Sequence, residues 1–110
     1  MHLVKARIVQ GVQDLPAMRA FYADFFGSEP VVDQPDWVEF EVGNIRFALT
    51  NGQAPPGLSL AFKASDFRKT LQTFERAGIK HESIRVGQHE SLLDVKDPEG
   101  IIHTIYGSTD

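Results

Sequence analysis

The chain has 110 residues, of which 42% are hydrophobic and 24% are charged, and its formal net charge is −4. This length and composition indicate one globular domain and exclude a disordered chain, while the acidic balance argues against a nucleic-acid partner. Cysteine is absent from the sequence, which excludes disulfides, thiolate nucleophiles and cysteine-ligated metals.

The first half of the chain reads as a strand, a helix and three further strands. Residues 3–12 alternate between apolar and polar side chains, as a strand does. Asp14 is a typical helix N-cap, Pro16 suits a first helical turn, and Gly27 is a typical residue at a helix end. Three short strands are then predicted at residues 30–34, 37–42 and 45–49, with a hairpin turn at residues 43–44.

The second half repeats this order after a linker-like stretch at residues 51–57, which is rich in glycine and proline. A strand is expected at residues 58–64, and Asp66 is a typical cap for a helix that ends at Gly78. The apolar stripe of this helix consists of Phe67, Leu71, Phe74 and Ala77. Three more strands are predicted at residues 79–86, 91–96 and 101–106.

The two halves align in pattern, with Asp14 opposite Asp66 and a glycine at the end of each helix. The sequence therefore predicts an α+β fold of two tandem βαβββ modules, at about residues 1–50 and 58–110, within a single domain over residues 1–110. Neither half is large enough to bury a core alone, so we expect the halves to pack on each other or on a second chain.

Two segments of the chain carry a resemblance to a known family. Residues 12–15 with 20–27, and the Asp-Pro-Glu-Gly turn at 97–100 followed by the strand at 101–106, resemble signatures of the vicinal-oxygen-chelate superfamily. That superfamily includes glyoxalase I, bleomycin-resistance proteins, fosfomycin-resistance enzymes and extradiol dioxygenases. The resemblance implies the glyoxalase/bleomycin resistance/dihydroxybiphenyl dioxygenase-like fold, in which curled mixed sheets surround a cup. It covers nearly the whole chain and specifies the fold better than the function.

In metal-dependent members of the superfamily, His, Glu or Gln side chains on the first and last strands of each module bind a divalent ion. At the equivalent positions of this sequence, the first module offers Arg7 and Ala48, and the second offers Ser59 and Thr104. A guanidinium, a methyl group and two hydroxyls do not make a divalent-metal site. We therefore expect neither a metal nor another cofactor, and no catalytic residue is assigned.

Trp37, Glu39 and Glu41 alternate onto one face of a predicted strand. That face either lines the cup or is the solvated outer face of an antiparallel sheet. Arg7 could offer a fork of donors to either carboxylate or to an acidic group on a ligand. A cationic ligand would suit Trp37 and the carboxylates, an anionic one would suit the basic residues, and both stay open. The candidate ligand-binding residues are Arg7, Trp37, Glu39, Glu41, Arg46, Ser59, Lys63, Thr104 and Tyr106.

None of the histidines, His2, His81, His89 and His103, has the spacing of a metal site. We expect His81 and His89 at the surface, on the hairpin between the sixth and seventh predicted strands. His103 shares the parity of its apolar neighbours, which predicts a core histidine under a helix.

Three functions follow as hypotheses. The preferred one is a metal-free protein that binds a small organic molecule in the cup, of a sequestration or resistance type. The alternatives are a glyoxalase-, lyase- or dioxygenase-like enzyme with an atypical metal site, and an interaction module without a ligand. We expect a homodimer, because curled half-sheets leave exposed strand edges. The sequence shows neither a membrane span nor a signal peptide, so a cytoplasmic location without a membrane partner is expected.

Overall fold

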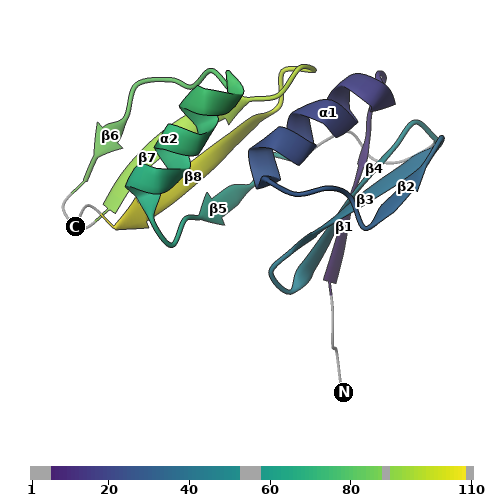
Figure 1. The fold of residues 1–110 in the computed structure, drawn as a ribbon, viewed down its shortest axis with the longest axis horizontal. Coiled ribbons are helices and arrows are strands. Elements are labelled where there is room, and N and C mark those ends of the chain that lie inside the picture. The colour runs from purple at the N-terminus through teal and green to yellow at the C-terminus, as the bar shows by residue number, and fades with distance from the viewer. Residues whose placement is uncertain (1–5, 53–57, 88–89, 109–110) are drawn as a thin grey trace. The chain divides into compact units, whose positions relative to one another are not determined.

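The computed structural model describes residues 6–52, 58–87 and 90–108 (Figure 1). The chain divides into two compact units, residues 1–58 and 59–110. Each unit contains one helix and one four-stranded sheet. The boundary between the units comes directly after the linker-like stretch of the sequence.

The first unit consists of β1 (Ala6–Gly11), α1 (Leu15–Phe26), β2 (Val32–Gln34), β3 (Trp37–Val42) and β4 (Ile45–Thr50). Its strand order is β1-β4-β3-β2, with β1 parallel to β4 and the other neighbours antiparallel. Asp14 caps α1, because its carboxylate oxygen Oδ1 accepts a hydrogen bond from the backbone N–H of Ala17 at 3.1 Å. Gly27 ends the helix in the left-handed conformation, with φ of 66°.

The second unit consists of β5 (Ala61–Lys63), α2 (Phe67–Ala77), β6 (Arg85–Val86), β7 (Glu90–Lys96) and β8 (Ile102–Ser108). Its order β5-β8-β7-β6 has the same pattern of parallel and antiparallel neighbours. Asp66 caps α2 through the Lys69 N–H at 3.0 Å, and Gly78 ends it with φ of 74°. The predicted α+β class and βαβββ repeat are confirmed. Neither of the described helices is long and apolar enough to cross a bilayer.

The core of the first unit lies between α1 and one face of its sheet. Met18, Tyr22 and Phe25 of α1 are buried. Phe40 of β3 lies opposite Phe47 of β4, and the ring centroids of Tyr22 and Phe47 are 4.9 Å apart. Alternate residues of the same strands point to the other side, which leaves the face away from α1 to polar side chains.

The core of the second unit is less complete than its predicted helical stripe suggests. Phe74 is fully buried, whereas Phe67 and Leu71 are only half-buried and Ala77 is exposed. Ala77 is the last residue of α2, directly before Gly78, which ends the helix. The sheet contributes Leu93, Val95 and Ile105 to this core.

Two predicted strands of the second unit are shorter than expected. The strand at residues 58–64 is confined to β5, because the N–H of Leu60 donates to the imidazole Nδ1 of His103 at 3.0 Å instead of to a neighbouring strand. The strand at residues 79–86 is confined to β6, and ahead of it His81 pairs with β7 only as an isolated bridge. This segment starts late because the N–H of Ile79 still donates to a carbonyl oxygen of α2. In the first unit, the strand predicted at residues 30–34 likewise shortens to β2.

The Asp-Pro-Glu-Gly turn joins β7 to β8 through the side chain of Asp97. Its buried carboxylate oxygen Oδ1 accepts hydrogen bonds from the backbone N–H groups of Glu99 and Ile101, both at 2.9 Å. Gly100 completes the turn with φ of 89°. The motif is therefore an Asx-type turn that satisfies backbone donors away from water.

Candidate functional site

The polar residues predicted in the first half of the chain lie on one face of the first unit's sheet. Arg7 of β1, Arg46 of β4 and Glu41 of β3 stand in one row across the strands. Alternation along β3 places Glu39 and Trp37 on the same face as Glu41. We call these five residues the unit 1 polar face.

Glu39 is the centre of this face, with a side chain that is only 3% exposed. Its oxygen Oε1 accepts a hydrogen bond from the indole Nε1 of Trp37 at 2.9 Å, and Nε of Arg7 lies 3.4 Å from the same oxygen. Its other oxygen, Oε2, accepts from Nη1 of Arg46 at 3.0 Å. Both oxygens are thus engaged, as a buried carboxylate requires.

The two arginines differ in how far they are covered. Arg46 is 25% exposed and also pairs with Glu41, whose Oε2 lies 3.2 Å from its Nη2. The Nε atom of Arg46 is buried and has no hydrogen-bond partner among the described residues. Arg7 is 57% exposed, and its Cζ lies 5.9 Å from the centroid of the Trp37 ring, within cation–π range.

The exposures of Glu39 and Glu41 differ, which bears on the two interpretations that the sequence leaves open for this strand. The near-complete burial of Glu39 contradicts a fully solvated outer face. Glu41 is 47% exposed and does fit a solvated position. Whether this face binds a ligand stays a prediction.

The second unit carries a smaller polar cluster at the equivalent register. Asp94 of β7 lies opposite Thr104 of β8, as Glu39 lies opposite Ala48 in the first unit. The hydroxyl of Thr104 donates to Asp94 Oδ1 at 2.7 Å, and Nη2 of Arg85 donates to the same oxygen at 3.1 Å. Sequence reasoning missed Asp94 and Arg85, although the internal repeat would have pointed to Asp94 once the hairpin register was known.

The remaining predicted residues divide between this cluster and its surroundings. Lys63 of β5 lies beside Tyr106 of β8, and alternation along β8 puts Tyr106 on the same face as Thr104. Ser59 is exposed and precedes the first residue of β5, and its part in a ligand site stays a prediction.

The positions at which the fold family would hold a divalent ion do not fit one. Arg7 brings a cation without a lone pair, Ala48 brings a methyl group, and Thr104 has its hydroxyl on Asp94. Ser59, the fourth position, lies outside the strands. Among the described residues, no three His, Asp or Glu side chains are grouped so as to hold a metal.

His103 is fully buried in the second unit, which confirms the expected core histidine. Burial lowers the pKa of its imidazole, and the nearby charge of Asp97 raises it by less. The neutral ring accepts from Leu60, so its place is structural. His81 precedes β6 instead of lying on the β6–β7 hairpin, which corrects the expectation. His2 and His89 lie outside the described residues.

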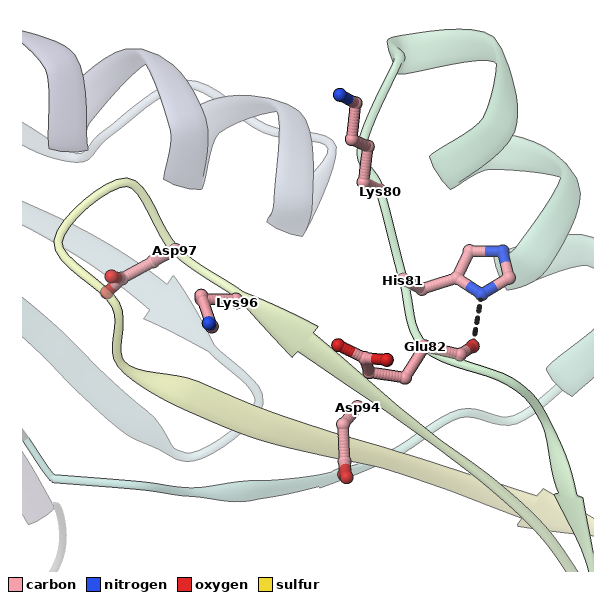
Figure 2. A pocket seen from close by; sticks show the side chains of 6 residues that line it. All are labelled: Lys80, His81, Glu82, Asp94, Lys96 and Asp97. Atoms are coloured by element: carbon pink, nitrogen blue, oxygen red, sulfur yellow. Dashed lines mark hydrogen bonds between the residues drawn. The ribbon is translucent and has the colours of Figure 1, made fainter.

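An open pocket of about 290 Å³ lies in the second unit (Figure 2). Its lining residues are Lys80, His81, Glu82, Asp94, Lys96 and Asp97. Figure 2 shows the imidazole of His81 directed away from the carboxylates of Glu82 and Asp94, with its Nδ1 2.8 Å from the backbone carbonyl oxygen of Glu82. The histidine and the carboxylates do not converge, so this pocket offers no acid–base or metal constellation.

Comparison with known proteins yields matches in structure only. Neither a protein-family model nor a curated protein matches the sequence. A glyoxalase/bleomycin resistance protein from Catenulispora acidiphila has a TM-score of 0.82 at 14% identity, covering 96% of this chain and 98% of its own. An antibiotic-binding protein from a Streptomyces species has a TM-score of 0.78 at 16% identity, covering 99% and 98%. A lactoylglutathione lyase from Agrobacterium tumefaciens has a TM-score of 0.74 at 24% identity, covering 93% and 91%.

The paired βαβββ units and these likenesses define an α+β protein with the glyoxalase/bleomycin resistance fold. The resemblance to the vicinal-oxygen-chelate superfamily is thereby confirmed at the level of the fold.

Proposed function

We propose that this chain is a metal-free protein of the vicinal-oxygen-chelate fold that binds a small organic molecule on the unit 1 polar face. The observation that carries the proposal is the pair of Arg7 and Glu39. Arg7 stands at the family's first metal-ligand position, and its Nε lies 3.4 Å from the buried carboxylate of Glu39. A bleomycin resistance protein and an antibiotic-binding protein among the structural neighbours support a sequestration or resistance role.

The arrangement of this face suits binding without chemistry. Glu39 holds the indole of Trp37 and the guanidinium of Arg46 at hydrogen-bond distance, so both side chains are fixed before a ligand arrives. A pre-formed site loses less conformational entropy on binding than a mobile one. Sequestration needs only such complementarity, and no nucleophile or metal.

An enzyme of the glyoxalase, lyase or dioxygenase type is the alternative, since a lactoylglutathione lyase has the same fold. Such an enzyme would need metal ligands other than Arg7, Ala48, Ser59 and Thr104. An interaction module without a ligand, the third hypothesis, would leave Trp37 insensitive to every small molecule. Both alternatives are tested by the experiment below.

We further propose that the two units act together as one domain in a cytoplasmic homodimer. Each four-stranded sheet ends in two edge strands, β1 and β2 in one unit and β5 and β6 in the other. Val86 on β6 and Ile102 on β8 are exposed. Unpaired edges and apolar surface favour association with a second copy.

Trp37 makes the binding proposal directly testable, because it is the only tryptophan of the chain. Its indole N–H gives a single resonance in a ¹⁵N-correlation spectrum of the labelled protein. We expect some members of a library of small planar compounds to shift this resonance in a saturable way. The shifts should persist in EDTA, and untagged protein should carry no stoichiometric metal.

A matched pair of variants locates the effect. Glu39→Gln removes the charge that orients Arg7 and Arg46, and should weaken binding on the order of tenfold. Asp33→Asn changes an exposed carboxylate of the same unit and should leave binding unchanged. A library without a single saturable hit, or binding abolished by EDTA, would refute the proposed function.

A further inference from the structure

We infer that the unit 1 polar face selects an aromatic acid, whose carboxylate is bound by the outward edge of the Arg7 guanidinium. The inference rests on the proposed function and decides between the cationic and anionic ligands that the sequence leaves open. Among the described residues, the face has few hydrogen-bond acceptors without a partner and several donors without one.

The acceptors of the face are largely occupied. Glu39 gives Oε1 to Trp37 and Arg7 and Oε2 to Arg46, and its side chain is buried. Glu41 already pairs with Arg46 through Oε2. A cationic ligand would therefore find only the exposed Glu41 carboxylate, which already shares its charge with Arg46, unless it displaced an arginine from Glu39.

The donors of the face are in surplus. A guanidinium has five N–H donors in a planar fork. Arg7 turns Nε towards Glu39 and makes no further hydrogen bond or ion pair among the described residues, which leaves the donors of both Nη atoms. The buried Nε of Arg46 is also without a partner in the described part of the chain. Unused donors on an exposed cation fit a carboxylate, which accepts two parallel hydrogen bonds from such a fork.

The aromatic part of the ligand follows from Trp37. Its Nε1 is held by Glu39, and the Cζ of Arg7 lies 5.9 Å from the ring centroid. A second cation would compete with Arg7 for the same ring. A flat acid would instead place its carboxylate on Arg7 and its ring beside the indole.

Glu39 is the positioning residue in this scheme. It holds the Nε edge of Arg7, and because the side chain of Arg7 is 57% exposed, its Nη donors are left for a ligand. Glu39 shares its carboxylate with Arg46, whose Nη1 lies 3.0 Å from Oε2, so Arg7 has no carboxylate of the face to itself.

Three probes of one shape and different charge test the inference: benzoate, benzamide and benzylammonium. Each is titrated into the ¹⁵N-labelled full chain while the indole resonance of Trp37 is followed. We expect benzoate to bind on the order of tenfold more tightly than benzamide, and benzylammonium to bind more weakly still.

Variants of Arg7 then connect the preference to one side chain. Arg7→Gln should abolish the preference for benzoate over benzamide. Arg7→Lys, which keeps the charge but loses the fork, should retain only part of it. Arg19→Gln is the matched control, because Arg19 is a helix arginine of the same unit that pairs with Glu29 and Asp33. It should behave as wild type.

The outcomes separate this inference from the proposed function. Equal affinity for the three probes, or a benzoate preference that survives Arg7→Gln, would overturn the assignment of an acid. So would an indole resonance that benzoate leaves unmoved. In each of these cases a neutral or cationic hit from the compound library would leave the proposed function standing.

Discussion

Glu39 shows how a charged residue is accommodated inside this small protein. An ionised carboxylate that loses its water must recover hydrogen bonds from the chain, and Glu39 recovers them from Trp37 and Arg46, with Arg7 as a further ion-pair partner. Removing one of these partners leaves a buried charge under-compensated, which costs more than the pair contributes in the intact protein.

The first expectation at this scale concerns Arg46. Replacing it in Arg46→Met should lower the free energy of unfolding by roughly 3 kcal/mol, because Glu39 stays buried without its closest cation. Urea denaturation of the full chain measures the change. The control is Arg19→Met, whose partners Glu29 and Asp33 are exposed, and its loss should stay within about 1 kcal/mol. Equal losses in both variants would contradict the importance of the buried pair.

The second expectation concerns pH. Burial in the folded protein lowers the pKa of His103 below the ordinary histidine value of 6.5. The unfolded chain therefore takes up a proton at this residue at higher pH than the folded chain does. Stability should be fully present above pH 6.5 and should fall as the pH drops below it, by at most ~1.4 kcal/mol per pH unit.

Urea denaturation at a series of pH values tests this expectation. His103→Asn is the informative variant, since its side-chain oxygen can still accept from the Leu60 N–H but does not titrate. The slope below neutrality should be shallower in the variant. A slope identical to that of wild type would show that other groups cause the loss.

At the scale of single elements, the closing turn depends on one oxygen atom. Asp97 Oδ1 accepts from the N–H groups of both Glu99 and Ile101. Asp97→Ala should lower the free energy of unfolding by about 2 kcal/mol, because two backbone donors lose their acceptor. Asp97→Asn keeps an oxygen in place and should cost clearly less. If both variants lose the same amount in urea denaturation, the charge of Asp97 matters and its hydrogen bonds do not.

Local signals explain which elements could be predicted from the sequence. The caps Asp14 and Asp66 and the terminal glycines fixed both helices to within a residue, because each signal acts through neighbouring backbone groups. β5 and β6 came out shorter because the Leu60 N–H bonds to His103, far away in the sequence, and because the chain before β6 pairs only at His81.

The unit 1 polar face could be predicted only in part, because the burial of its residues depends on contacts between distant strands. Alternation along β3 placed Trp37, Glu39 and Glu41 on one face, but the period does not tell which of them is covered. Glu39 is buried and Glu41 is not, which depends on the register of three strands. Asp94, the partner of the predicted Thr104, and Arg85 were missed because the longer turn between β7 and β8 hides that register.

At the scale of the whole molecule, we expect two copies of the chain to associate as a homodimer. Each unit exposes two edge strands, and a 12.3 kDa chain with two thin cores gains stability by covering them. We expect sedimentation equilibrium at micromolar concentration to give twice the mass of one chain. A mass of 12.3 kDa under those conditions would refute the homodimer.

The central claim is that Arg7, and not a metal ion, forms the ligand site at the position where related proteins have a metal ligand. The most direct test follows the Trp37 indole resonance while Zn²⁺ or Ni²⁺ is added to untagged, chelator-treated protein. The account predicts that stoichiometric metal leaves this resonance unmoved, in wild type and equally in Arg7→His, because Ala48 and Thr104 supply no free ligand. A saturable shift of the wild-type indole at one equivalent of metal would contradict it.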